Sequence, residues 1–191
     1  MSPPLAAVLA GGRSRRMGAA KATVPFAGRP LIERPVGAAL AAGLETVVVA
    51  KPDSALPPLG VPVWREPAEP RHPLTGLVAA LEGAGGRPVV ALACDMPFVA
   101  PALLRRLAAL RGTVAPRVAG RLEPFPARYA PEALEVLREA LEREAPLRAA
   151  LAALGPAELG EQELRAFGDP VRLVRGLNTR DELAEAEAAL G

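Results

Sequence analysis

Two adjacent glycines and a cluster of basic side chains occupy the segment Gly11–Lys21. Gly11 and Gly12 follow an unbroken apolar run, and the basic residues after them are Arg13, Arg15, Arg16 and Lys21. Glycine lets a backbone pass close to a ligand with its N–H groups turned inward, and arginine and lysine bind phosphate oxygens. The segment therefore predicts a polyphosphate-binding loop, although its spacing is that of neither a Walker A loop nor a dinucleotide fingerprint. A solvated basic loop with glycine turns is the alternative.

Asp95 is a second residue whose position suits chemistry. It follows the apolar run Pro88–Ala93 and Cys94, so it lies just past a predicted buried strand. A carboxylate there can bind a hard cation, because Mg²⁺ prefers carboxylate and phosphate oxygens. An aspartate that precedes Met96 and Pro97 can also cap a helix. The residues around Asp95 leave both roles open.

Lysine and asparagine are rare in this chain, so we consider the few that occur as candidate functional residues. Lysine is found only at positions 21 and 51 and asparagine only at 178, while arginine supplies the other positive side chains. Lys21 is therefore the candidate for a compact point charge on a triphosphate. Asn178 precedes a predicted helix, so it either contacts a ligand or caps that helix together with Thr179.

These residues must be positioned by an alternation of strands and helices. Strands are predicted at Leu5–Ala10, Thr46–Ala50, Val61–Trp64, Pro88–Ala93, Thr113–Val118, Phe125–Ala130 and Val171–Val174. Helices are predicted at Pro30–Ala42, Thr75–Glu82, Pro101–Leu110, Pro131–Glu144, Leu147–Leu154 and Thr179–Leu190, and Gly155–Gly168 is expected to be a surface connection. Such alternation indicates an α/β fold with a mainly parallel sheet covered on both faces. Ligands of such folds bind at the carboxyl ends of the strands.

Composition excludes several other classes of protein. The 191 residues fit one domain, 1–191, and the single cysteine and single histidine exclude an internal disulfide and a His-based metal cage. No apolar run approaches the ~20 residues of a membrane span, and the N-terminus lacks a basic signal region. A net charge of +2 without aromatic residues among the basic ones argues against nucleic-acid binding. The expected location is the cytoplasm.

The order of the motifs resembles that of one known family. Leu9-Ala10-Gly11-Gly12-x-Ser14-x-Arg16-Met17-Gly18-x-x-Lys21 is similar to the signature of the MobA family, the molybdenum cofactor guanylyltransferases. Further similar segments follow in the family's order: Pro30-Leu31, Pro73–Leu77, Cys94–Val99, Glu123–Tyr129 and Leu177–Leu183. The matches span nearly the whole chain, and Gly12 favours the guanylyl branch over the related cytidylyltransferases.

The resemblance implies a fold, a reaction and a set of site residues. The fold would be the three-layer α/β/α Rossmann-like nucleotidyltransferase fold. The reaction would transfer GMP from Mg·GTP to the phosphate of molybdenum-bound molybdopterin, with pyrophosphate leaving. The family's catalytic residues fall on Arg16, Lys21 and Asp95, with Asp95 as the Mg²⁺ ligand. Its nucleotide-binding residues fall on Leu9, Ala10, Gly11, Gly12, Lys21, Glu66, Asp95 and Asn178. Transient contact with cofactor-assembly or apo-molybdoenzyme proteins would follow.

One departure from the family bears on the choice of nucleotide. Ala50 stands where family members carry asparagine, so any base or ribose contact from that side chain is absent. Lys51 or Asp53 are the candidates to replace it. A sister nucleotidyltransferase that uses CTP on molybdopterin, or an NTP on a sugar or alcohol phosphate, is therefore an alternative. A non-catalytic, nucleotide-dependent protein that delivers the cofactor is the alternative from a different class.

Overall fold

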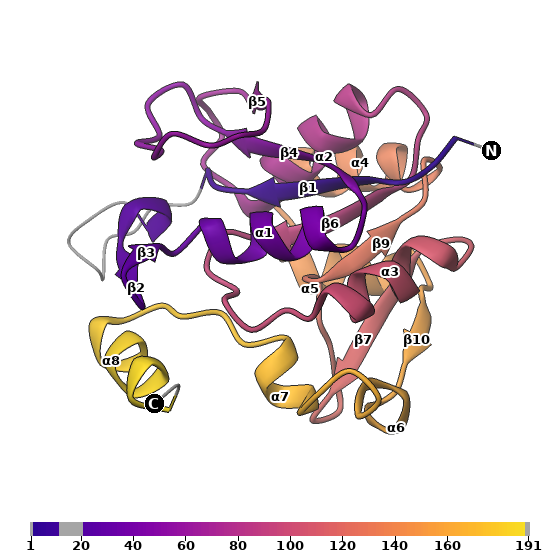
Figure 1. Ribbon diagram of the computed structural model, residues 1–191. Helices are drawn as coiled ribbons and strands as arrows, with labels where there is room; N and C mark the ends of the chain where they lie inside the picture. The colour runs from indigo at the N-terminus through magenta and orange to yellow at the C-terminus, as the bar shows by residue number, and fades with distance from the viewer. Residues whose placement is uncertain (1, 12–20, 190–191) are drawn as a thin grey trace.

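A computed structural model describes residues 2–11 and 21–189 of the chain, and within these residues one large sheet forms the centre of the fold (Figure 1). Its strand order is β10-β7-β9-β6-β1-β4-β5, with β8 paired to β7. The strands are β1 (Leu5–Leu9), β4 (Glu45–Ala50), β5 (Val63–Arg65), β6 (Val89–Ala93), β7 (Val114–Val118), β8 (Arg121–Leu122), β9 (Ala127–Tyr129) and β10 (Ala157–Leu159). A separate hairpin joins β2 (Pro25–Phe26) and β3 (Arg29–Pro30).

The sheet is mainly parallel, as the sequence predicts. β1 pairs in parallel with both β4 and β6, β4 pairs in parallel with β5, and β10 pairs in parallel with β7. β9 is antiparallel to its neighbours β6 and β7. The carboxyl ends of β1, β4, β5 and β6 therefore meet at one edge of the sheet, where this class of fold binds its ligands.

Helices cover both faces of the sheet and complete three layers. The helices of the described residues are η1 (Lys21–Thr23), α1 (Glu33–Ala41), α2 (Pro73–Gly83), α3 (Pro101–Ala109), α4 (Ala133–Glu142), α5 (Leu147–Ala153), α6 (Glu161–Leu164), α7 (Pro170–Leu173) and α8 (Arg180–Ala188). In Figure 1, α1 and α3 lie in front of the sheet, with α2, α4 and α5 behind it. The α/β/α arrangement expected from the resemblance is confirmed.

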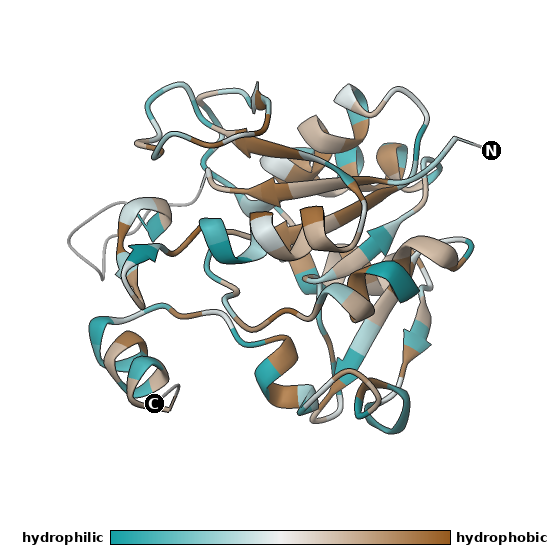
Figure 2. Cartoon of the chain, in the orientation of Figure 1, coloured by the Kyte–Doolittle hydropathy of each residue, from teal (hydrophilic) through white to brown (hydrophobic). Residues whose placement is uncertain are grey.

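The apolar strands supply two separate cores, one on each face. On β1, Ala6 and Val8 pack with α1 and α3, whereas Leu5 and Ala7 pack with α2, α4 and α5. Successive residues of a strand point to opposite faces, so a continuous apolar run is what a strand buried on both faces requires. Figure 2 shows this on β1 and β4, whose ribbons are largely brown.

Two predictions about the C-terminal third were wrong. Val171–Val174 was expected as a strand, but Pro170–Leu173 forms the short helix α7. Asp169 accepts a hydrogen bond from the Arg172 N–H at 2.7 Å, and proline occupies the first turn, so a helix start signal outweighs two β-branched residues. The expected connection Gly155–Gly168 contains both an edge strand, β10, and the helix α6.

The first helix also begins later than expected, because a hairpin intervenes. Pro30 belongs to β3, and α1 begins at Glu33. Ala27 and Gly28 both have positive φ, at 48° and 77°, which is the two-residue turn that suits the twist of a hairpin. This hairpin packs against α8 through a third apolar cluster: Phe26, Leu31, Leu177, Leu183 and Ala186. In Figure 1 the hairpin and α8 lie together at one end of the molecule.

Candidate active site

Three side chains from distant parts of the chain meet at the carboxyl edge of the sheet. The Lys21 ammonium donates to Asp95 Oδ2 at 2.5 Å and to Asn178 Oδ1 at 2.6 Å. Asp95 comes just after β6, Lys21 opens η1, and Asn178 precedes α8. The side chains of Lys21 and Asp95 are 20% and 13% exposed, so the ion pair is accessible from solvent. The cluster combines a cation, a carboxylate and an amide, as a phosphate- and metal-binding site requires.

The segment before α8 crosses directly over Asp95. The Leu177 N–H donates to the Asp95 carbonyl oxygen at 2.9 Å. At Gly176, a Cβ atom would lie 3.0 Å from Asp95 Oδ1, so glycine permits this close passage. Because this segment leads into α8, and α8 is held by the hairpin that follows Lys21, the same packing brings Asn178 and Lys21 to the carboxylate.

Helix capping does not account for Asp95 or Asn178. The residue that precedes the first turn of α3 is Ala100, not Asp95. At α8 the cap is Thr179, whose hydroxyl accepts from the Glu182 N–H at 3.1 Å while Glu182 accepts from the Thr179 N–H at 3.2 Å. The side chains of Asp95 and Asn178 therefore remain available to the site.

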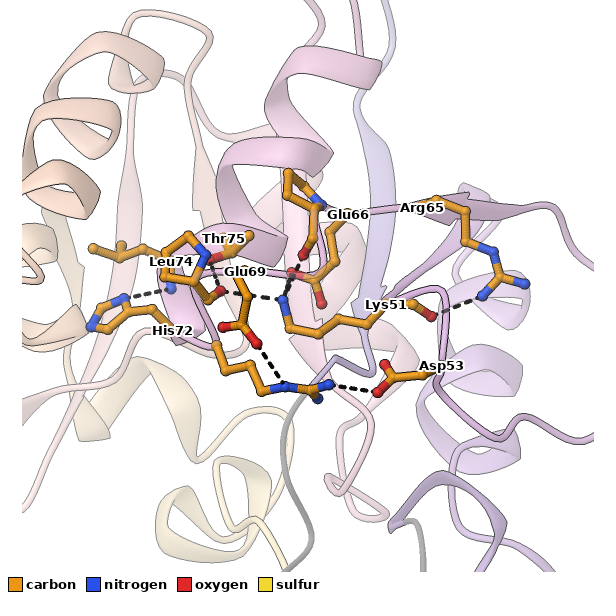
Figure 3. A network of polar contacts seen from close by, with 11 residues as sticks. Lys51, Asp53, Arg65, Glu66, Glu69, His72, Leu74 and Thr75 are labelled. Carbon is orange, nitrogen blue, oxygen red and sulfur yellow. Dashed lines mark hydrogen bonds and ion pairs between the residues drawn. The ribbon is translucent and has the colours of Figure 1, made fainter.

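A second polar cluster lies where β4 and β5 end (Figure 3). Lys51 and Glu66 directly follow these strands, and each side chain is 2% exposed. The Lys51 ammonium lies 3.8 Å from Glu66 Oε2 and donates to the carbonyl oxygens of Pro67 at 2.7 Å and Pro70 at 3.3 Å. The Lys51 ammonium is therefore held by protein acceptors and does not itself replace the absent asparagine as a ligand contact.

The Glu66 carboxylate packs closely against two glycines, Gly11 and Gly76. A Cβ atom on Gly11 would lie 1.4 Å from Glu66 Oε1, and one on Gly76 would lie 3.1 Å from Oε2. Burial raises the pKa of Glu66, while the charges of Lys51 and Arg71 oppose that rise. A side chain at position 11 would displace the carboxylate, which gives a physical reason for glycine at the end of β1.

Asp53 and His72, which lie next to this cluster, form contacts within the protein. Asp53 binds Arg71 at 2.5 Å, and the Arg71 guanidinium beside it lowers the pKa of the exposed carboxyl group. His72 caps α2, since its Nδ1 accepts from the Leu74 N–H at 3.2 Å. Asp53 therefore supplies no contact in place of the asparagine missing at position 50.

The predicted nucleotide loop is only partly within the described residues. Leu9 ends β1, the Ala10 N–H donates to the Val49 carbonyl at 2.8 Å, and the Cys94 N–H donates to the Leu9 carbonyl at 3.1 Å. These bonds hold the end of β1 at the sheet edge beside Glu66 and Asp95. Gly12 and Arg16 lie outside the described residues.

A cavity of about 450 Å³ opens beside the Lys21–Asp95–Asn178 cluster. Its lining comes from the ends of β6, the approach to β9, the start of α5 and the segment before α8: Ala93, Asp95, Met96, Glu123, Pro124, Phe125, Pro146, Leu147, Arg148, Val174, Gly176 and Asn178. The sequence did not single out Arg148, which has no motif of its own. Its guanidinium binds Glu123 Oε2 at 2.8 Å, so this wall of the cavity carries an ion pair.

Other kinds of site are not found in the described part of the chain. Burial raises the pKa of the Cys94 thiol to about 12, which keeps it protonated and unsuited to act as a nucleophile. Residues 2–11 and 21–189 contain no group of three or more His, Cys, Asp or Glu side chains that could hold a metal ion. No helix in these ranges is long and apolar enough to cross a membrane.

Comparison with known proteins decides the family. The family described as MobA-like NTP transferase domain matches residues 6–159, which include Lys21, Glu66 and Asp95. The chain belongs to this family. It is therefore a nucleotidyltransferase, and the non-catalytic delivery alternative is set aside.

The relatives of this MobA-like transferase agree along most of its length. A protein of Chloroflexus aggregans named "probable molybdenum cofactor guanylyltransferase" is 31% identical over 96% of this chain and 93% of the relative. A protein of the same name from Pelotomaculum thermopropionicum is 32% identical over 70% of this chain and 67% of the relative. The solved structure of molybdopterin-guanine dinucleotide biosynthesis protein A from Archaeoglobus fulgidus superposes with a TM-score of 0.80 at 26% identity, covering 97% of each chain.

Proposed function

We propose that this transferase moves GMP from Mg·GTP to the phosphate of molybdenum-bound molybdopterin, giving the guanine dinucleotide cofactor and pyrophosphate. The observation that carries the proposal is the convergence of Lys21, Asp95 and Asn178 beside a cavity at the carboxyl edge of the sheet. The relatives that match along the chain are named molybdenum cofactor guanylyltransferases, which supports GTP and molybdopterin as the substrates.

The residues of the chain supply positioning and electrostatics in this reaction. Lys21 and Arg16 would neutralise the triphosphate, and Asn178 would orient Lys21 through the 2.6 Å hydrogen bond. The backbone from Leu9 to Gly12 would hold the nucleotide, and Glu66 would meet its base. The attacking phosphate is already ionised near neutral pH, so no general base is needed. Catalysis would then come from holding the attacking phosphate in line with the α-phosphorus and the leaving pyrophosphate.

The residues around Asp95 fit Mg²⁺ when nucleotide phosphates are present. The carboxylate is partly exposed and already faces the ammonium of Lys21, so its position favours positive charge. It is a single carboxylate, and Mg²⁺ is commonly held by one or two carboxylates together with phosphates and waters. Asp95 would therefore hold the ion against the triphosphate, where the ion would neutralise charge on the phosphate oxygens.

The cavity beside Asp95 is the proposed place of the acceptor. Arg148 lines this cavity and lies at the start of α5, far along the chain from the nucleotide loop. Its guanidinium suits an anionic pterin phosphate. We also propose that the enzyme is a single domain, that it works in the cytoplasm, and that it makes transient contact with cofactor-assembly or apo-molybdoenzyme proteins.

Nucleotide binding tests the choice of GTP. We expect GTP with Mg²⁺ to raise the melting temperature, since ligand at ~100 times its dissociation constant adds about 2.7 kcal/mol. CTP, ATP and UTP at the same concentration should raise it far less. The measurement is a melting curve with each nucleotide, with and without Mg²⁺. A larger shift with CTP would contradict the guanylyl assignment and favour the sister transferase, for which the apolar side chain of Ala50 leaves room.

A further inference from the structure

Lys51 and Glu66 form a buried charge pair, and neither the family comparison nor the proposed reaction gives Lys51 a role. Each side chain is 2% exposed, although burial of a charge is costly unless it is paired. The two residues follow β4 and β5, which are hydrogen-bonded neighbours, and the Glu66 N–H continues their ladder by donating to the Ala50 carbonyl at 3.1 Å. The sheet itself therefore fixes both Cα positions.

The two partners of the pair differ in how well they are satisfied. The Lys51 ammonium donates to two acceptors, the Pro67 and Pro70 carbonyls, and forms an ion pair with Glu66. Glu66 has the 3.8 Å ion pair to Lys51, and its carboxylate oxygens accept no hydrogen bond within the described residues. Figure 3 shows the Lys51 side chain extended toward Glu66. Lys51 is anchored, whereas Glu66 retains unused acceptor capacity.

The unused acceptors lie at the start of the nucleotide loop. Glu66 Oε1 occupies the space where a Gly11 side chain would be, and Oε2 lies close to Gly76 in α2. Burial favours the neutral form of this carboxyl group, and the charged groups that oppose this are Lys51 and Arg71. An ionised carboxylate accepts hydrogen bonds only, so it selects a partner with N–H donors.

We propose that Lys51 is a positioning residue that keeps Glu66 ionised and oriented to accept the paired donors of a guanine base. Guanine presents its N1–H and its 2-amino group side by side, which matches the two oxygens of one carboxylate. The pair then takes over the role left without a polar side chain at Ala50. This inference rests on the proposed function, because it assigns the base selectivity of the same site.

The test compares the binding of Mg·GTP with that of Mg·ITP, whose base lacks the 2-amino group, by titration calorimetry. We expect wild-type protein to prefer GTP by about 20-fold, the size of one hydrogen bond to a charged group. Lys51→Met should reduce this preference at least about 5-fold while the melting curve stays cooperative. Arg65→Met is the matched control, since Arg65 donates to the Lys51 carbonyl at 2.9 Å but is not a partner of Glu66. It should leave the preference unchanged.

A double-mutant cycle separates action through Glu66 from a purely structural role. If Lys51 acts through Glu66, then Lys51→Met should change GTP affinity by less than about 2-fold in a Glu66→Gln background. The double variant buries no charge, so this comparison holds even if Lys51→Met alone does not fold. Equal weakening of GTP and ITP, or additive effects in the cycle, would overturn the inference. Wild-type protein that prefers CTP over GTP would overturn the proposed function, and the inference with it.

Discussion

Asp95→Ala should lower the rate of pyrophosphate release by about 1,000-fold or more, because it removes the carboxylate that is proposed to hold Mg²⁺ and that pairs with Lys21. The fold should survive, since Asp95 holds its neighbour Leu177 through a backbone carbonyl that alanine retains. The measurement is multiple-turnover pyrophosphate release with GTP, Mg²⁺ and molybdopterin, together with a melting curve of the variant.

Asp181→Ala is the matched control for this variant. Asp181 is an exposed aspartate in the first turn of α8, near the site in sequence but outside the cluster. It should retain a rate close to that of the wild-type protein. Near-normal pyrophosphate release by Asp95→Ala would exclude Asp95 as the metal ligand.

Lys21→Met should lower kcat by about 100-fold or more, because an ammonium aimed at charge that develops on the phosphates contributes mainly in the transition state. Lys21 donates to Asp95 and Asn178 at 2.5 and 2.6 Å, and these bonds hold its charge in place. Lys21→Arg keeps the charge but not the compact geometry, and we expect it to recover only part of the rate.

The measurement for Lys21 is a comparison of kcat and KM for GTP among the wild type, Lys21→Met and Lys21→Arg. A fall in kcat larger than the rise in KM is the expected pattern. A rise in KM alone would mean that Lys21 only binds the nucleotide. Full activity of Lys21→Met would remove Lys21 from the catalytic residues.

The strands at the centre of the sheet could be predicted from the sequence, because burial on both faces requires long apolar runs. β1, β4 and β6 are such runs, and the structure confirms each within one residue at either end. Short elements outside the centre could not be predicted in this way. The edge strand β10 has only three residues, and its Glu158 is exposed and pairs with Arg117, so it carries no apolar pattern.

The site could be predicted only as far as its motifs reach. Lys21, Asp95 and Asn178 were selected from motifs and rarity, and their meeting depends on long-range packing of α8 against the hairpin, which no local pattern encodes. The partnership of Lys51 with Glu66 follows from the parallel pairing of β4 and β5, a register that the sequence does not state. Arg148 enters through the position of α5, which is likewise a tertiary feature.

The most direct test of the proposed function is transfer of labelled GMP. The purified protein would be incubated with Mg²⁺, molybdenum-bound molybdopterin and GTP labelled at the α-phosphate. The label incorporated into the pterin product and the amount of pyrophosphate released would be measured in the same reaction. We predict one labelled GMP in the product for each pyrophosphate released, with labelled CTP giving little product. Transfer from CTP in place of GTP, or no transfer from GTP under conditions where it binds, would contradict the account.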